Sequence, residues 1–120
     1  MMDEYITYDS QAVFANATIY FDFDKTNLTS KSLQTLKSVA EVLNENSQLR
    51  VTLAGHADER GTREYNLALG QRRAEAVSQY LILNDVSKNR LVVKSFGEEK
   101  PIAFGQDEQS YSKNRRVEIN

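Results

Sequence analysis

The residues most suited to chemistry lie between Gly55 and Ala76, a span that holds the chain's only histidine, two adjacent carboxylates and several arginines. His56 has a carboxylate two positions further on, at Asp58. A zinc site needs three or four nitrogen, sulfur or carboxylate ligands, and the chain offers no second histidine and no cysteine. The span also lacks the ligand spacing of known calcium-binding loops. We therefore expect no metal, and we expect His56 to be hydrogen-bonded at a strand end.

The same span is a poor match to an enzyme active site. Asp58 and Glu59 are neighbours, and adjacent side chains usually diverge, so they do not form an acid–base pair across one bond. No Gly-x-Ser-x-Gly turn marks a serine nucleophile, and Gly61 and Gly70 stand alone rather than in a phosphate-binding glycine loop. The sequence therefore favours a protein without enzymatic activity and without a cofactor.

A binding surface is the stronger interpretation of these residues. Asn66, Gly70 and Arg73 are spaced by four and three residues, which places them on one face of a helix. Gly70 either lets a ligand approach or serves close packing of the helix against a sheet, and both remain open. Arg73 offers a planar fork for a carboxylate and Asp58 an anion for an ammonium, so together they match a zwitterion. The alternative is that the two pair with each other or with solvent.

Strands and helices alternate along the chain. Periodicity and turn residues predict strands over 17–21, 49–54, 91–96 and 115–119. A first helix is expected to begin at Thr29 or Ser30, and a second to be capped by Thr62 and to run to about Asn84. Their buried stripes are predicted to be Leu33, Leu36, Ala40 and Leu43 in the first helix, and Leu67, Ala74, Val77 and Leu81 in the second. Residues 55–61 are expected to form a loop, and the last two strands to be joined by a polar connection.

This β-α-β-α-β-β order predicts an α/β protein, more closely an α+β two-layer sandwich in which the helices pack on one face of a mixed sheet. With 120 residues the chain can form one core, which we assign to residues 17–120, with residues 1–16 as a lead-in segment or linker remnant. A net charge of -2 argues against general electrostatic attraction to nucleic acid or an anionic membrane. No apolar run reaches about 18 residues, so no membrane-spanning segment is expected.

Four longer motifs occur in a fixed order: "IYFDFDKTNL", "GHADERGTREYNLALGQRRAEAV", "SFGEEKPI" and "YSKNRRVEI". Together they resemble the OmpA-like peptidoglycan-binding domain over about residues 17–119, nearly the whole chain. The resemblance implies the fold of that family, an OmpA-C-like domain. It also implies non-covalent binding of the peptidoglycan stem peptide through meso-diaminopimelate, whose far end carries a free ammonium and a free carboxylate.

Motif positions carry the family's binding residues over to this sequence. The resemblance implies that Asp58 takes the ammonium and Arg73 the carboxylate of the ligand. The other residues implied to form the pocket are Phe23, Asp24, Asn66 and Leu67. Arg72 should point about 100° away from Arg73, toward the surface. Arg115 and Arg116 of the closing motif are expected to form ion pairs that fasten the last strand.

The resemblance further implies a cellular setting. Lipid-anchored members of the family tether the outer membrane of Gram-negative bacteria to the cell wall from its periplasmic face, and bind the β-propeller protein TolB through a surface overlapping the "HADERGTREYN" loop. We expect this chain to be a soluble fragment of such a protein, since it contains no cysteine to lipidate. Three alternatives stay open: an OmpA-like module of another envelope protein, a module that chiefly docks TolB, and a peptidoglycan hydrolase.

Overall fold

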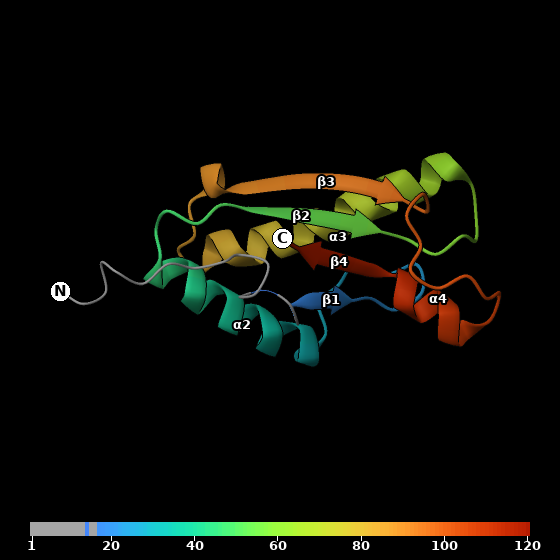
Figure 1. Ribbon diagram of the computed structural model, residues 1–120, viewed down its shortest axis with the longest axis horizontal. Coiled ribbons are helices and arrows are strands. Elements are labelled where there is room, and N and C mark those ends of the chain that lie inside the picture. The colour runs from blue at the N-terminus through green and yellow to red at the C-terminus, as the bar shows by residue number, and fades with distance from the viewer. Residues whose placement is uncertain (1–13, 15–16) are drawn as a thin grey trace.

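The computed structural model describes Phe14 and residues 17–120, so the expected lead-in segment lies almost wholly outside the described residues. The elements follow in the order β1 (Thr18–Tyr20), α2 (Ser30–Glu45), β2 (Val51–His56), α3 (Arg63–Leu83), the 3₁₀ helix η2 (Lys88–Arg90), β3 (Leu91–Gly97), α4 (Glu108–Asn114) and β4 (Arg116–Ile119) (Figure 1). The predicted β-α-β-α-β-β order is confirmed, with two short elements added: the 3₁₀ helix η2 before β3 and the helix α4 before β4.

The four strands of the described region form one mixed sheet in the order β1-β4-β2-β3. β4 is antiparallel to both of its neighbours: Ile19 of β1 faces Val117, and Leu53 of β2 faces Ile119. β2 and β3 are parallel, with Leu53 opposite Val93, and α3 connects them. The last strand of the chain therefore lies inside the sheet, between β1 and β2 (Figure 1).

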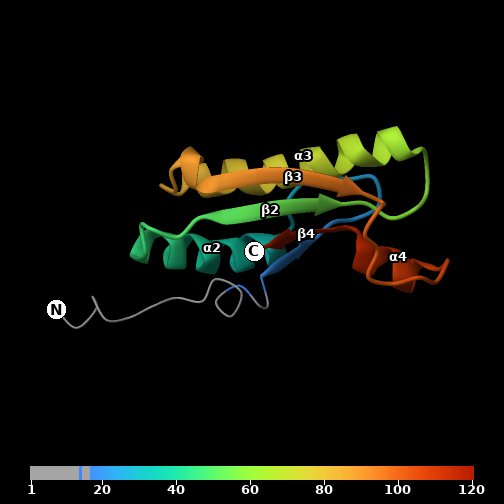
Figure 2. The ribbon, with the colours of Figure 1, turned by 45° about the horizontal axis from the view of Figure 1, so that its top comes forward.

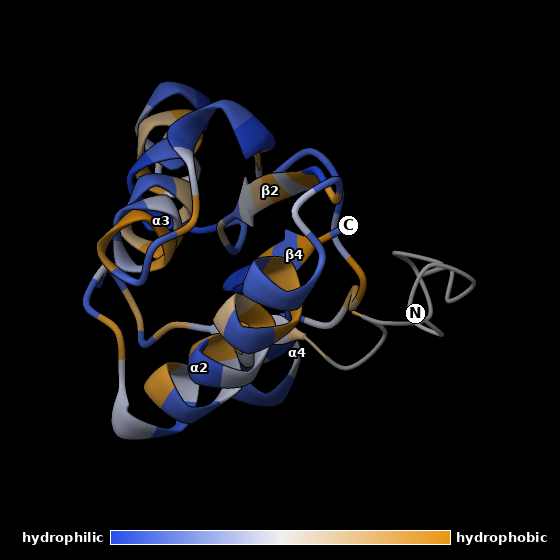
Figure 3. Cartoon of the chain, turned by 90° about the vertical axis from the view of Figure 1, so that its left-hand side faces the viewer, coloured by the Kyte–Doolittle hydropathy of each residue, from blue (hydrophilic) through white to orange (hydrophobic). Residues whose placement is uncertain are grey.

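The two long helices pack on the same face of the sheet, as the sequence predicted. In Figure 3, α2 and α3 lie together on one side of β2 and β4, and Figure 2 shows α3 running along β3. The completely buried apolar side chains between the layers include Ile19, Leu53 and Val117 from the sheet, and Leu36, Leu43, Val77 and Leu81 from the helices. No helix in the described part of the chain is both long enough and apolar enough to cross a membrane.

Each long helix begins at a hydroxyl side chain. Thr29 Oγ1 accepts a hydrogen bond from the Ser32 amide at 3.1 Å, and Thr62 Oγ1 accepts one from the Tyr65 amide at 3.1 Å. These bonds satisfy amides at the start of a helix that have no partner within it. Both predicted caps are confirmed.

The predicted buried stripes are correct except at one position in each helix. Leu33 of α2 is 39% exposed, and Leu67 of α3 is only half-buried. In α2 the buried position belongs to Ser32, whose hydroxyl lies 3.4 Å from the Tyr20 carbonyl oxygen at the edge of the sheet. The next residue points about 100° further round the helix, which turns Leu33 toward solvent.

Two further predicted boundaries are wrong. Gly55 and His56 belong to β2 rather than to the following loop, because Gly55 pairs with Val117 of β4 and His56 pairs with Gly97 of β3. The connection before β4 contains α4, which begins after the Asp107 cap. This helix is seven residues long and carries no apolar stripe, so the hydrophobic pattern gave no signal for it.

Gly55 of β2 and Gly70 of α3 bring helix and strand into backbone contact. A Cβ atom at Gly55 would lie 1.8 Å from the Gly70 carbonyl oxygen, and one at Gly70 would lie 2.4 Å from Ser95 Oγ and 2.9 Å from the Gly55 carbonyl oxygen. A side chain fits at neither position without moving the backbone. Of the two interpretations of Gly70, helix–sheet packing is therefore the correct one. The contact also sets Arg73 within reach of the end of β2.

Candidate ligand-binding site

A cavity of about 200 Å³ lies at the carboxyl end of β2, where the loop after β1 meets the loop before α3. The sequence-predicted residues that line it are Phe23, Asp24, Asp58, Asn66 and Arg73. Leu67 does not line it: Ser95 Oγ of β3 donates a hydrogen bond to the Leu67 carbonyl oxygen at 2.7 Å, and Leu69 lines the cavity instead. Sequence reasoning also missed two polar members of the lining, Arg60 and Tyr65.

Arg73 reaches the cavity from α3 and is completely buried. Its guanidinium donates to three carbonyl oxygens: Nε to Lys25 at 2.9 Å, Nη1 to His56 at 2.9 Å and Nη2 to Asp22 at 3.1 Å. Burial, and then the positive charge of Arg115, lower the pKa of Arg73 to about 10, so the side chain stays charged at neutral pH. A guanidinium has five N–H donors, and within the described structure these three bonds leave two of them.

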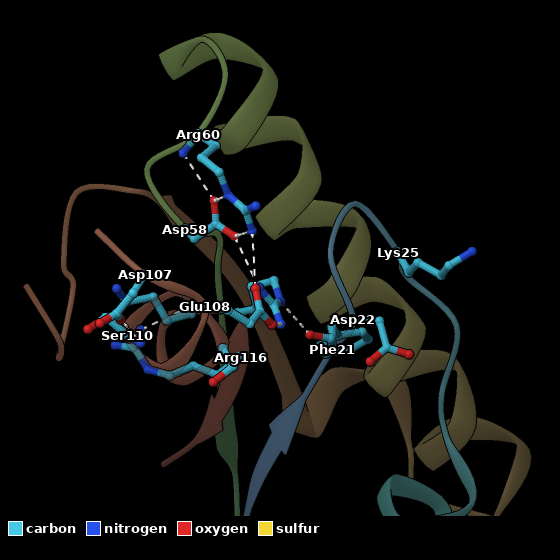
Figure 4. A network of polar contacts seen from close by, with 12 residues as sticks. Phe21, Asp22, Lys25, Asp58, Arg60, Asp107, Glu108, Ser110 and Arg116 are labelled. Atoms are coloured by element: carbon cyan, nitrogen blue, oxygen red, sulfur yellow. Dashed lines mark hydrogen bonds and ion pairs between the residues drawn. The ribbon is translucent and has the colours of Figure 1, made fainter. Parts of the chain in front are cut away.

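Asp58 is almost completely buried at the same cavity, 4% exposed. Arg60 holds both of its oxygens, with Nε 3.1 Å from Oδ1 and Nη2 2.8 Å from Oδ2 (Figure 4). Burial alone would raise the pKa of Asp58, but hydrogen bonds from the side chain and amide of Arg60 outweigh it and hold the pKa below its ordinary value. Asp58 is therefore a carboxylate at neutral pH.

Arg60 lies between two aromatic rings. Its guanidinium carbon is 4.0 Å from the ring centre of Phe23, on the loop after β1, and 4.3 Å from that of Tyr111, on α4. Cation–π contacts of this kind stabilise a charged side chain beside an aromatic ring. Unlike a hydrogen bond, they do not fix the side chain to a single atom. The only signal in the sequence was that Arg60 follows Asp58 by two residues, a spacing that allows a turn in which the carboxylate also accepts from the Arg60 amide, here at 3.0 Å.

Arg115, at the junction of α4 and β4, is a second cation next to Asp58. Its Nη1 lies 3.4 Å from Asp58 Oδ2, its Nη2 donates to Glu108 Oε2 at 2.6 Å, and its Nε donates to the Phe21 carbonyl oxygen at 2.8 Å. Figure 4 shows Glu108 and Phe21 on opposite sides of this network. The predicted ion pairing of the closing motif is confirmed. Arg115 has the additional role of linking the last strand to the cavity.

Asp24 and Tyr65 form one rim of the cavity. The Tyr65 hydroxyl donates to Asp24 Oδ1, and this hydrogen bond raises the pKa of Tyr65. Asp24 has a φ of 58°, a left-handed conformation that aspartate tolerates better than most residues. Beside them, Asn66 Nδ2 donates to the Arg60 carbonyl oxygen at 3.1 Å and to Glu98 Oε1 at 2.7 Å, so Asn66 holds the loop before α3.

The expectation of a hydrogen-bonded His56 is wrong. The residue is 1% exposed, its ring stacks on Phe96 at 5.6 Å between centres, and neither ring nitrogen has a hydrogen-bond partner among the described residues. Glu118 Oε1 lies 3.8 Å from Nε2, beyond hydrogen-bond distance, and Oε2 of Glu118 accepts from Arg116 at 2.7 Å. Burial, and then the charge of Arg116, lower the pKa of His56 to about 4, so the ring is neutral at neutral pH.

The arrangement as a whole separates charges of opposite sign around one cavity. Asp58 pairs with Arg60 and Arg115, and Arg73 bonds to backbone carbonyls, so the described residues show no direct pair between Asp58 and Arg73. Across residues 17–120, no three potential metal-ligating side chains converge on one point. The cavity is therefore suited to a small ligand that carries both charges.

Comparison with known proteins places the chain in a family. Residues 20–115 match the OmpA family, and the chain belongs to that family. It is similar to peptidoglycan-associated lipoproteins: it is 50% identical over 111 residues to the one from Pseudomonas aeruginosa, covering 92% of this chain and 66% of the relative. It is also 50% identical over 100 residues to the one from Haemophilus influenzae, covering 83% and 65%. The chain thus spans just under two thirds of the length of these relatives.

Solved structures confirm the fold. The crystal structure of the peptidoglycan-associated lipoprotein from Burkholderia pseudomallei is 43% identical and superposes with a TM-score of 0.85, covering 88% of this chain and 89% of that one. The C-terminal domain of Helicobacter pylori MotB is only 23% identical, with a TM-score of 0.79 over 86% of this chain and 81% of that one, and shows the fold alone. The predicted family and the predicted mixed-sheet sandwich are both confirmed.

Proposed function

We propose that the cavity binds the zwitterionic end of meso-diaminopimelate in the stem peptide of peptidoglycan, without covalent chemistry. The observation that carries the proposal is the completely buried Arg73, which lines the cavity with two N–H donors left, beside the carboxylates of Asp58 and Asp24. An ammonium and a carboxylate on the same carbon match these charges. The names of the relatives from Pseudomonas and Haemophilus support peptidoglycan as the polymer.

Each lining residue then has a distinct role. Arg73 binds the carboxylate through its remaining N–H groups, and Asp58 binds the ammonium. Phe23 and Leu69 supply apolar wall for the methylene chain between the two ends of the ligand. Asn66 acts on the ligand indirectly, by fixing the loop that carries Asp58 and Arg60.

In a whole protein, this binding would tether the outer membrane of a Gram-negative envelope to the cell wall, with the domain on the periplasmic side. The relatives are named lipoproteins, which supports a lipid anchor in a full-length protein as the other end of the tether. We place this activity within the Tol-Pal system. No chemical step is required, and purified protein should leave muropeptides uncleaved.

Isothermal titration calorimetry with the tripeptide L-Ala-γ-D-Glu-meso-diaminopimelate tests the site. Asp58→Asn and Arg73→Lys should each weaken binding by about tenfold or more, because each removes charge-assisted hydrogen bonds worth about 1.5–3 kcal/mol. Arg63→Gln is the control: Arg63 bonds to Glu99 on the surface, does not line the cavity, and should bind like the parent chain. No binding at millimolar ligand, or equal binding by Asp58→Ala and Arg73→Ala, would contradict the assignment.

A second candidate function is docking of TolB on the same surface. It is favoured by two large side chains at the cavity mouth, Phe23 at 53% and Tyr65 at 45% exposed, since exposed aromatic residues are enriched at protein interfaces. A pull-down separates the two functions. If Phe23→Ser and Tyr65→Ser abolish TolB capture and also weaken tripeptide binding, the surfaces overlap. If both variants capture TolB as the parent chain does, TolB docks elsewhere on the domain.

A further inference from the structure

Asp58 already has cations of its own in this structure. Oδ1 accepts from the Arg60 amide at 3.0 Å and from Arg60 Nε at 3.1 Å, while Oδ2 accepts from Arg60 Nη2 at 2.8 Å and from Arg115 Nη1 at 3.4 Å. A carboxylate offers about four lone-pair sites. In this arrangement each site has a donor, so an ammonium can bind Asp58 only if one of the donors leaves.

Of the two arginines, Arg60 is the one that is free to leave. The Arg115 side chain is 5% exposed and is fixed from three directions, by Phe21, Glu108 and Asp58. The Arg60 side chain is 37% exposed and lines the cavity. Its other neighbours are the faces of two aromatic rings, which allow the guanidinium to slide between them.

Arg60 also has a second acceptor within reach. Its Nη2 lies 3.7 Å from Glu108 Oε1, and the Glu108 side chain is 67% exposed. A rotation of the guanidinium between the rings would exchange Asp58 for Glu108 as its acceptor. The Arg60 guanidinium therefore has two carboxylates near it, Asp58 at hydrogen-bond distance and Glu108 slightly further away.

We propose that Arg60 is a built-in competitor for the ligand's ammonium: it neutralises Asp58 in the empty site and moves to Glu108 when the ammonium binds. This inference rests on the proposed function, because it concerns the same carboxylate. It makes Arg60 a residue that determines specificity. An ammonium alone must displace a bidentate guanidinium, whereas a ligand whose carboxylate is held at the same time by Arg73 has a second contact to offset that displacement.

Arg60→Gln tests the competition directly, with three tripeptides that differ only at the far end of their third residue. The meso-diaminopimelate peptide carries ammonium and carboxylate, the 2-aminopimelate peptide carries the carboxylate alone, and the lysine peptide carries the ammonium alone. Calorimetry should show about tenfold tighter binding of the first and the lysine peptides to Arg60→Gln than to the parent chain, and no gain for the 2-aminopimelate peptide. Arg63→Gln, with the same change of charge outside the cavity, should show none of these gains.

Glu108→Gln should have the opposite effect on the meso-diaminopimelate peptide, because it removes the acceptor that receives Arg60 and releases Arg115 to bind Asp58 more closely. Its matched control is Glu59→Gln, because Glu59 is an exposed carboxylate that accepts a hydrogen bond from Gln106 Nε2. Unchanged or weaker binding by Arg60→Gln, an equal gain for the 2-aminopimelate peptide, or tighter binding by Glu108→Gln would each overturn the competition. Equal binding by the parent chain and Asp58→Asn would instead overturn the proposed function.

A measurement on the parent chain covers the case in which Arg60→Gln fails to fold. The Nε–H of Arg60 is bonded to Asp58 in the empty site, so its exchange with solvent should be slow. Saturating the protein with the meso-diaminopimelate peptide should speed that exchange, as followed by arginine Nε–H nuclear magnetic resonance. Slower or unchanged exchange would show that Arg60 keeps its place on Asp58 and would overturn the inference.

Discussion

Two arginines, at opposite ends of the sheet, both donate hydrogen bonds to three backbone carbonyl oxygens, but their surroundings differ. Arg73 donates to the carbonyl oxygens of Asp22, Lys25 and His56 at the carboxyl end of β2. Arg90, in η2 at the other end, donates to the carbonyl oxygens of Leu43 and Asn46, both at 2.7 Å, and of Leu49 at 2.9 Å. Each arginine links its own helix to a neighbouring segment by donating to backbone carbonyl oxygens of that segment.

The difference lies in what surrounds each guanidinium. The acceptors of Arg90 all come from one continuous stretch, the end of α2 and the turn into β2, and its side chain is half-buried. Arg73 joins the loop after β1 to the end of β2, is completely buried, and lines a cavity together with two carboxylates. A backbone-bonding arginine is thus not a binding residue by itself. Arg73 is a candidate binding residue because it lines a cavity next to groups of opposite charge. The contacts of Arg90 among the described residues include neither, so Arg90 is a matched structural control.

Arg73→Ala should have the largest effect, because it removes a buried cation together with its hydrogen bonds to three backbone carbonyl oxygens. We expect the free energy of unfolding to fall by about 4 kcal/mol and tripeptide binding to be lost. Urea unfolding and calorimetry measure the two effects. Wild-type stability in this variant would show that the three bonds contribute nothing and would remove the basis of the comparison.

Acid should lower the free energy of unfolding through His56, which lies at the same end of the sheet as Arg73. The His56 carbonyl oxygen accepts a hydrogen bond from Arg73. The pKa of His56 is about 4 in the folded chain and about 6.5 unfolded, so between these values the unfolded chain binds a proton that the folded chain does not. Stability should therefore fall as the pH drops through this window, by about 3 kcal/mol in all at about 1.4 kcal/mol per pKa unit. His56→Phe keeps the stacking on Phe96 and lacks the titration.

Urea unfolding at pH 7 and pH 4.5 measures the histidine contribution as the difference between the parent chain and His56→Phe. The variant should lose clearly less stability on acidification. An equal loss in both proteins would mean that carboxylates account for the whole pH dependence and that His56 titrates normally.

Arg90→Ala should have the smallest of the three effects. Its bonds lie at the end of a helix where water can replace the lost donor, so we expect a loss of about 2 kcal/mol in the free energy of unfolding. Tripeptide affinity should stay within about twofold of the parent value. A marked loss of affinity would show that the two ends of the sheet are coupled and that Arg90 is no control.

The fold could be predicted because its signals are local. Thr29 and Thr62 mark helix starts through their own hydroxyls, and the buried stripes of the long helices follow a simple period. The errors occurred where tertiary contacts decide. Ser32 displaces Leu33 because of a bond to Tyr20, and Gly55 extends β2 because β4, sixty residues away in the chain, pairs with it. Periodicity carries no information on such pairings.

The site could be predicted in part, through its motif. Five predicted residues line the cavity, but the pattern did not reveal their partners. The contacts of Arg60 come from three separate regions, with Phe23 on one loop and Tyr111 on a helix that has no hydrophobic period. The sequence also could not predict that His56 lacks hydrogen bonds. That outcome depends on the position of Glu118, one oxygen of which bonds to Arg116 while the other lies 3.8 Å from His56.

The central place of β4 has a consequence for how the molecule is made. Among the described strands, β1 pairs only with β4, and β4 is the strand that separates β1 from β2. Residues 18–20 therefore have no strand partner until residues 116–118 are in place. Pairings so distant in the chain close slowly. During synthesis the sheet cannot be completed until residues 116–119 have emerged, and Arg115 reaches Asp58 only at that stage. A chain that stopped before residue 116 would lack a central strand of this sheet rather than an edge strand.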